Sequence, residues 1–348
     1  MKPGLVDHIP VEAWLKDSRG RSMAFSAYPA AHPWLQVLIC HGFGEHRGWW
    51  HHVAEAFQKE GVTVFSFDNF HHGVSDGAPS DVADYNHLAD GVLLAMHQGV
   101  APRRVKGVGL VVLGHSNGAL AALLASPRFA PGEVSAMVIC SPLLGLSPLA
   151  TFGGGAAARL LYKIDPAIRI RLHRDLKENT RNQAIWEDFS RDPLRFQHIS
   201  VRFFIEMARA ARQARETITL PGMAVLLLGG GKDKVVHRKH YLRWYQRLES
   251  PDKKLIEYPQ MVHELFNEPD WLEVFYDTLE WLRDRFQTAP QTPPGPKPAT
   301  EKTPRKSRKK AGKPATAQAQ TKAHTEAKPK SKPTAGFKKK PSHQKGAP

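Results

Sequence analysis

The sequence predicts an α/β fold with a mostly parallel central sheet that is flanked by helices. Apolar runs of strand length alternate with segments of helical length through residues 10–287. The strand runs are apolar at successive positions, which is typical of strands buried on both faces of a parallel sheet. The chain of 348 residues is long enough for one such domain and an appendage.

Strands and helices are expected in alternation along the body of the chain. The expected parallel strands are residues 35–40, 62–67, 109–113, 134–140, 223–228 and 253–259, and the helices between them are residues 50–60, 83–99, 117–127 and 238–249. Residues 12–17 and 23–29 have the pattern of an antiparallel hairpin at the sheet edge, and residues 267–286 that of a final helix with an apolar stripe. The alternation stops between residues 145 and 220, which we interpret as a helical insertion that covers one end of the sheet.

Residues 288–348 differ in composition from the rest of the chain. They contain 16 Lys or Arg and two Glu, a charge of +14, so residues 1–287 carry only +2 of the total of +16. Their one large apolar side chain is Phe337. Such a segment cannot bury enough apolar surface to offset its ordering entropy. We therefore expect residues 1–287 to form the domain and residues 288–348 a disordered tail, rich in Lys, Pro and Ala, that can contact nucleic acid, polyphosphate or an anionic membrane nonspecifically.

Composition excludes several classes of protein. Cys40 and Cys140 both lie in apolar runs, so a disulfide framework is not expected and a reducing compartment fits. The first ten residues lack the apolar core of a signal peptide, and no run reaches the ~18–20 apolar residues that span a bilayer. These features predict a cytoplasmic protein, with a peripheral position at a membrane or the nucleoid as the alternative that the basic tail introduces.

Ser116 is the candidate nucleophile, in the pentapeptide Gly-His-Ser-Asn-Gly of residues 114–118. It follows a strand run and opens a helical segment, and a sharp strand–turn–helix junction lifts a hydroxyl clear of the sheet. Small neighbours are needed there because the serine backbone is strained and crowded. A second copy of the pattern surrounds Ser75, but Ala78 and Pro79 follow it instead of a helix. We therefore interpret Ser75 as a turn residue.

A serine nucleophile needs a base and an acid, which this architecture places later in the chain, in loops after strands. Asp233 is the only acid in the glycine-rich loop after the fifth parallel strand, and His263 lies in the loop before the last helix. His237 and His240 compete with His263, but they begin the preceding helix and should face solvent. His263 would take the Ser116 proton while Asp233 holds the imidazole tautomer.

Two backbone N–H groups are candidates for an oxyanion hole. Phe43 belongs to the glycine-rich turn of residues 41–46, directly after a strand run, and Asn117 follows the nucleophile. Two such donors stabilise the oxygen that becomes negative in the transition state. The spacing of the histidines around this turn matches no metal motif, so we expect neither a metal nor another cofactor, and we expect His41 to orient the turn by hydrogen bonding.

Five segments in this order resemble the α/β-hydrolase fold: HGFGEH, FDNFHHGVSDG, GHSNG, GGGKDKVV and YPQMVHELFNE. More narrowly, they resemble the monoacylglycerol lipase and lysophospholipase branch, which shares its domain class with serine aminopeptidases of the S33 type. The resemblance covers about residues 10–286. It implies that Ser116, Asp233 and His263 are the catalytic triad, that Phe43 and Asn117 are the oxyanion donors, and that residues 145–220 are a helical cap over the acyl pocket.

The resemblance implies a serine esterase or lipase that cleaves a carboxylic ester, a monoacylglycerol or a lysophospholipid, through an acyl-enzyme. One alternative is an aminopeptidase-type hydrolase of the same fold. The other is a polyanion-binding protein that acts through its basic tail.

Three features depart from the pattern of the family. Asn117 stands where a larger apolar residue is usual, and the loop DNFHHG lacks the usual Arg. The stretch of residues 145–220 contains eleven arginines. A solvated helical surface is the favoured interpretation of these arginines, and attraction to an anionic headgroup or membrane surface is the alternative.

Overall fold

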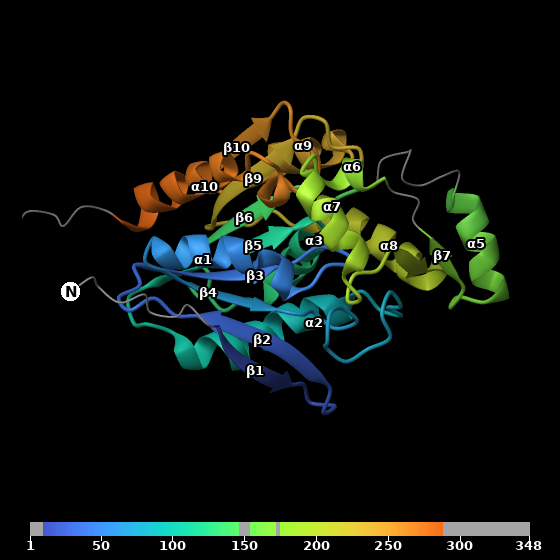
Figure 1. Ribbon diagram of the computed structural model, residues 1–348, viewed down its shortest axis with the longest axis horizontal. Helices are drawn as coiled ribbons and strands as arrows, with labels where there is room; N and C mark the ends of the chain where they lie inside the picture. The colour runs from blue at the N-terminus through green and yellow to red at the C-terminus, as the bar shows by residue number, and fades with distance from the viewer. Residues whose placement is uncertain (1–9, 146–153, 172–174, 288–348) are drawn as a thin grey trace, which may run out of the picture. The chain divides into compact units, whose positions relative to one another are not determined.

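An eight-stranded sheet forms the centre of the computed structural model, which describes residues 10–145, 154–171 and 175–287 (Figure 1). Its spatial order is β1-β2-β4-β3-β5-β6-β9-β10. The strands are β1 Val11–Lys16, β2 Ser22–Tyr28, β3 Leu35–Cys40, β4 Val62–Phe67, β5 Gly109–His115, β6 Ala136–Cys140, β9 Ala224–Gly230 and β10 Lys253–Tyr258. β1 pairs with β2 and β2 with β4 in antiparallel fashion, and every other pair is parallel. The predicted parallel sheet and its antiparallel edge hairpin are confirmed.

Helices cover both faces of this sheet. One face carries α1 His51–Lys59 and α10 Trp271–Phe286, and the other carries α2 Asn86–Leu94, α3 Ser116–Ala125, α8 Val201–Thr217 and α9 Arg238–Arg247. A π-helical turn, Ala95–Val100, continues α2. Along β3, Val37 and Ile39 pack on the first face, whereas Leu38 and Cys40 pack on the second. The unbroken apolar runs in the sequence arise because both faces of each central strand are buried.

The segment between β6 and β9 is the insertion that the sequence predicted. Its described elements are α5 Gly154–Ile164, β7 Arg169–Arg171, α6 Leu176–Asn179, α7 Gln183–Arg191, β8 His198–Ser200 and α8 (Figure 1). It is mostly helical, but β7 and β8 form a separate antiparallel pair that the sequence did not reveal. Strands of three residues are too short to leave an alternating apolar pattern.

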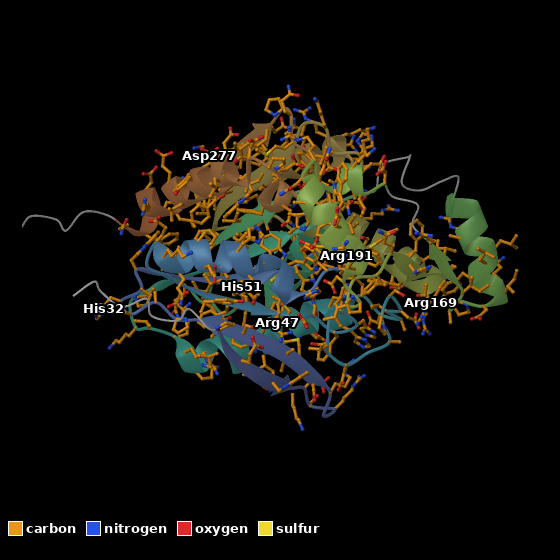
Figure 2. The ribbon with its side chains drawn as sticks, viewed as in Figure 1. His32, Arg47, His51, Arg169, Arg191 and Asp277 are labelled. Atoms are coloured by element: carbon orange, nitrogen blue, oxygen red, sulfur yellow. The ribbon has the colours of Figure 1, made fainter. Side chains whose placement is uncertain are left out.

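Most arginines of the insertion are held in ion pairs with nearby acids. The pairs are Arg181–Glu268, Arg191–Glu187, Arg195–Glu264, Arg202–Asp81, Arg209–Glu206, Arg212–Glu216 and Arg215–Glu216. The side chain of Arg191, labelled in Figure 2, is exposed at the end of α7. This pairing favours the interpretation of a charge-balanced helical surface, in which Arg195 and Arg215 are largely buried and the other paired arginines face solvent to a greater extent.

The last described helix, α10, ends at Phe286, and the domain boundary near residue 287 stays a prediction. The predicted disordered tail lies outside the described residues and stays a prediction. Cys40 and Cys140 are both buried free thiols. Among the described residues, the helices are too short or too polar to cross a bilayer.

Candidate active site

Ser116 stands at the sharp turn between β5 and α3. Its φ of 50° lies in the left-handed region, which is strained for a residue with a side chain. The flanking glycines are required by space. A Cβ on Gly118 would lie 2.2 Å from the carbonyl oxygen of Cys40, and one on Gly114 would lie 2.6 Å from the Cα of Ala119. The pattern Gly-x-Ser-x-Gly therefore follows from the close approach of α3 to the ends of β3 and β5.

A continuous chain of hydrogen bonds links Ser116, His263 and Asp233. The Nε2 of His263 lies 2.9 Å from the Oγ of Ser116, and its Nδ1 lies 2.8 Å from the Oδ2 of Asp233. The other carboxylate oxygen of Asp233 accepts the backbone N–H groups of Val235 (2.7 Å) and Val236 (3.0 Å). The side chains of Asp233 and His263 are only 2% and 4% exposed, so water competes little with these bonds.

The three side chains come from three loops that follow neighbouring parallel strands. Ser116 follows β5, Asp233 follows β9, and His263 follows β10. β5, β6, β9 and β10 are successive neighbours in the sheet, and parallel strands deliver their following loops to one edge. The structure thus brings together the three residues that the sequence analysis had selected from distant segments.

Ser141 holds the backbone of the loop that carries His263. It follows β6, and its hydroxyl donates to the His263 carbonyl oxygen at 2.8 Å. Its own N–H donates to the Leu228 carbonyl oxygen, and its φ of 42° is again left-handed. No motif in the sequence pointed to Ser141. The available signal was its position directly after a buried strand at the edge where the site forms.

The segments of Phe43 and Asn117 lie beside each other at the same edge. Cys40 of β3 is in register with Gly114 of β5, so the residues after the two strands are neighbours. Asn117 occupies the first turn of α3, where backbone N–H groups have no partner within the helix. The ring of Phe43 packs edge-on against Phe196 of the insertion, with centroids 5.2 Å apart. This placement agrees with a pair of N–H donors near the Ser116 hydroxyl.

His41 fixes the turn that contains Phe43. Its Nδ1–H donates to the Gly42 carbonyl oxygen at 2.8 Å, while its Nε2 accepts the N–H of Asn69 at 3.0 Å. Burial lowers the pKa of His41, which agrees with the neutral tautomer that these two bonds require. The predicted structural role of His41 is confirmed by these contacts.

A buried ion pair joins the same turn to β5, the strand that directly precedes Ser116. The Oε1 of Glu45 lies 3.1 Å from the Nδ1 of His115, and the Oε2 accepts N–H groups of Gly42 and Trp50. Burial alone would lower the pKa of His115, but the Glu45 carboxylate outweighs it and the pKa is raised. No pattern in the sequence predicted this pair, because the two residues are 70 positions apart and neither segment shows which partner it contacts.

Arg195 links the insertion to the loop of His263. Its guanidinium lies 3.5 Å from the carboxylate of Glu264, the residue after His263, and stacks 3.5 Å over the ring of Phe189. Burial raises the pKa of Glu264, and the nearby Arg195 opposes this shift. The insertion therefore contacts the loop that carries His263 through a largely buried cation.

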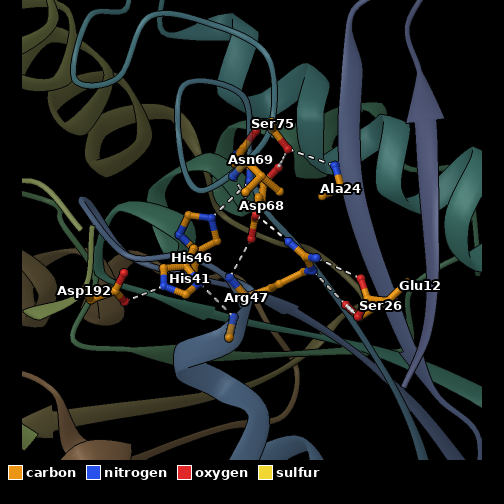
Figure 3. Close-up of polar contacts among 12 residues, drawn as sticks. Glu12, Ala24, Ser26, His41, His46, Arg47, Asp68, Asn69, Ser75 and Asp192 are labelled. Carbon is orange, nitrogen blue, oxygen red and sulfur yellow. Dashed lines mark hydrogen bonds and ion pairs between the residues drawn. The ribbon is translucent and has the colours of Figure 1, made fainter. Parts of the chain in front are cut away.

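Ser75, in the second Gly-x-Ser-x-Gly copy, has a structural environment (Figure 3). Its hydroxyl donates to the Asp68 carbonyl oxygen at 2.6 Å and accepts the Ala24 N–H at 2.9 Å. The buried Asp68 carboxylate accepts both the backbone N–H and the guanidinium of Arg47 (Figure 3). Arg47 thus supplies a cation beside the loop whose usual Arg is missing, and Ser75 anchors the loop to β2.

The two competing histidines lie outside the hydrogen-bonded chain. His237 caps α9 by accepting the N–H of Lys239. The expectation that His240 faces solvent is wrong: its ring is half-buried and lies against Gly145, where an added Cβ would be 2.2 Å away. Contacts with the insertion cover this side of α9, which sequence periodicity does not reveal. Within the described ranges, no cluster of three His, Cys, Asp or Glu side chains could hold a metal.

Comparisons with known proteins agree with this architecture. Residues 31–270 match the family model described as serine aminopeptidase, S33. A monoacylglycerol lipase of Mycolicibacterium smegmatis is 29% identical over 262 residues, which cover 73% of this chain and 90% of that protein. A human monoglyceride lipase is 29% identical over 266 residues, which cover 75% of this chain and 86% of the relative.

A solved structure shows the same fold. A soluble variant of the monoglyceride lipase from Saccharomyces cerevisiae superposes with a TM-score of 0.72 at 23% identity, covering 81% of this chain and 98% of that one. The α/β-hydrolase fold predicted from the sequence is confirmed, and the chain belongs to the serine aminopeptidase S33 family.

Proposed function

We propose that the protein is a serine hydrolase that cleaves carboxylic esters through an acyl-enzyme, with Ser116, His263 and Asp233 as its catalytic triad. The observation that carries this proposal is the buried chain of hydrogen bonds from the Ser116 hydroxyl through the His263 imidazole to the Asp233 carboxylate. A free serine hydroxyl is a poor nucleophile at neutral pH, and a base at 2.9 Å activates it.

Each group of the triad has a defined step. The Nε2 of His263 accepts the Ser116 proton as the Oγ attacks the ester carbonyl carbon, and the imidazolium then protonates the leaving alcohol. Water, deprotonated by the same imidazole, hydrolyses the acyl-enzyme and regenerates Ser116. Asp233 keeps the Nδ1 protonated and stabilises the positive ring. The N–H groups of Phe43 and Asn117 are the proposed donors to the oxyanion in both steps.

Monoacylglycerol is the proposed substrate, with a lysophospholipid as its competitor. The names of the bacterial and human relatives support a lipid monoester. Aromatic side chains next to the candidate donors support an apolar acyl chain: Phe43 packs against Phe196 and Phe203 of the insertion. An aminoacyl substrate would instead require an anionic group to meet its ammonium.

The experiment is hydrolysis of a 1-monoacylglycerol, a lysophosphatidylcholine of the same chain length and an aminoacyl p-nitroanilide by the full chain. We expect turnover of the first, loss of at least ~10³-fold in kcat in Ser116→Ala, and little turnover of the anilide. Ser75→Ala is the matched control, because it alters the other Gly-x-Ser-x-Gly copy and should retain kcat. Equal ester hydrolysis by Ser116→Ala and the wild type would overturn the proposal.

The basic tail carries a second, compatible proposal, motivated by its charge of +14. We propose that residues 288–348 bind polyanions without sequence preference, so that retention on DNA falls steeply with salt. Deletion of the tail should abolish retention at low salt and leave kcat unchanged. Equal retention with and without the tail would contradict the proposal.

A further inference from the structure

We propose that Tyr85 is a positioning residue for the oxyanion hole, acting through the side chain of Asn117. The proposal rests on the proposed function. The Tyr85 hydroxyl lies 2.6 Å from the Oδ1 of Asn117 and 3.2 Å from its carbonyl oxygen, so it donates chiefly to the side chain. The N–H of Asn117 is a proposed oxyanion donor. Asn117 also stands at a position where the family usually has an apolar residue.

The peptide group that carries this N–H is held on its other side as well. The N–H of Leu143 donates to the Ser116 carbonyl oxygen at 3.1 Å. In a trans peptide the carbonyl and the following N–H point in opposite directions, so this bond turns the Asn117 N–H away from Leu143. The bond from Tyr85 fixes the adjoining side chain. The Leu143–Ser116 bond restrains the peptide before the Asn117 Cα, and the Tyr85 bond restrains the Asn117 side chain. Together they fix the direction of the Asn117 N–H.

The Tyr85–Asn117 contact is buried on both sides. Tyr85 and Asn117 are each only 3% exposed, so water cannot replace a lost partner. Burial raises the pKa of Tyr85 well above its usual value, so the phenol stays a neutral donor across the working pH range. Removing only the hydroxyl would leave the Asn117 Oδ1 without its donor in a dry environment.

Tyr85 is itself rigidly placed. It directly precedes α2, and α2 packs along α3. Its ring contacts Phe203 of α8, at a centroid distance of 6.3 Å, and Phe203 contacts Phe43 at 5.6 Å. The residues of both proposed donors, Phe43 and Asn117, therefore meet a common support formed by Tyr85 and Phe203.

The test uses kcat and KM for a p-nitrophenyl ester and the inhibition constant of an alkyl boronic acid, which forms a tetrahedral adduct on serine. Complete removal of an oxyanion donor costs ~10²–10³-fold in kcat, so misalignment in Tyr85→Phe should cost about tenfold. KM should stay within about twofold, and the boronic acid should bind about tenfold more weakly, because only tetrahedral species use the donor fully. Tyr28→Phe is the matched control: Tyr28 is also 3% exposed, and its hydroxyl contacts His51 outside the site.

A double variant tests whether Tyr85 acts through Asn117. Tyr85→Phe combined with Asn117→Met replaces both polar partners by apolar groups, which is far less costly than leaving one unpaired. The reference is Asn117→Met alone: once the acceptor is gone, adding Tyr85→Phe should not lower kcat further. A kcat of Tyr85→Phe within twofold of wild type, an equal loss in Tyr28→Phe, or a further tenfold loss when Tyr85→Phe is added to Asn117→Met would overturn the inference. Wild-type turnover that survives Ser116→Ala would instead overturn the proposed function.

Discussion

Replacing Asp233 by Asn tests the tautomer argument directly. In the structure, one carboxylate oxygen of Asp233 accepts the N–H groups of Val235 and Val236, and the other faces the Nδ1 of His263. An asparagine must keep its carbonyl oxygen toward the two backbone donors. Its NH₂ group then faces Nδ1, which becomes an acceptor, so the ring proton moves to Nε2. An Nε2–H cannot accept the proton of Ser116.

The size of the effect follows from this blocked step. The corresponding change in a known serine protease lowers kcat by about 10⁴-fold, which corresponds to about 5.4 kcal/mol of activation free energy. We expect a similar loss for Asp233→Asn with little change in KM, because no group that binds the ester is altered. The assay is p-nitrophenyl ester hydrolysis against pH, with urea unfolding to establish that the variant is folded.

Asp277→Asn is the matched control for this change. Asp277 lies on α10 (Figure 2) and accepts a hydrogen bond from the Tyr258 hydroxyl at 3.0 Å. The substitution exchanges a carboxylate for an amide away from Ser116, so kcat should stay within about twofold. A folded Asp233→Asn variant that keeps more than a tenth of wild-type kcat would show that Asp233 does not set the tautomer of His263.

Three further predictions concern stability. Burial lowers the pKa of His72 to about 3. The unfolded chain, in which a histidine has a pKa of about 6.5, binds the proton at higher pH, so the free energy of unfolding falls as the pH drops from 6.5 toward 3. Between pH 7 and 5 this loss is about 2 kcal/mol, and the loss measured by urea unfolding should be smaller by that amount in His72→Asn. Gly118→Ala should lower the free energy of unfolding by about 3 kcal/mol, because the new Cβ would meet the Cys40 carbonyl oxygen at 2.2 Å; unchanged urea unfolding would contradict this. Ser141→Ala should cost about 0.5–1.5 kcal/mol by the same measurement. It removes the hydroxyl donor and leaves the His263 carbonyl oxygen with the Leu265 N–H at 3.2 Å. An unchanged free energy of unfolding would count against that role of Ser141.

The sequence allowed the sheet and the candidate site to be predicted because their determinants are local. Each buried strand is an apolar run, and Ser116 is marked by the strand before it and the helix after it. Asp233 and His263 could be selected because a parallel sheet brings the loops after its strands to one edge. Chain order and topology therefore sufficed to select three residues that the structure brings within hydrogen-bonding distance.

The remainder of the site depends on contacts between segments that no local pattern records. The partner of Glu45 is His115, and that of Asn117 is Tyr85, 32 positions earlier. The strands β7 and β8 are three residues long and form only because they pair with each other. These features are set by tertiary packing, which overrides or goes beyond local preference.

Active-site labelling can show whether Ser116 is the nucleophile of a hydrolase. The full chain is treated with a fluorophosphonate, digested, and analysed by mass spectrometry to locate the phosphonyl group. If Ser116 is the nucleophile, one group per chain is found, on Ser116, with no labelling in Ser116→Ala and parallel loss of ester hydrolysis. Labelling of another serine, or no labelling in a preparation that hydrolyses esters, would show that Ser116 is not the nucleophile.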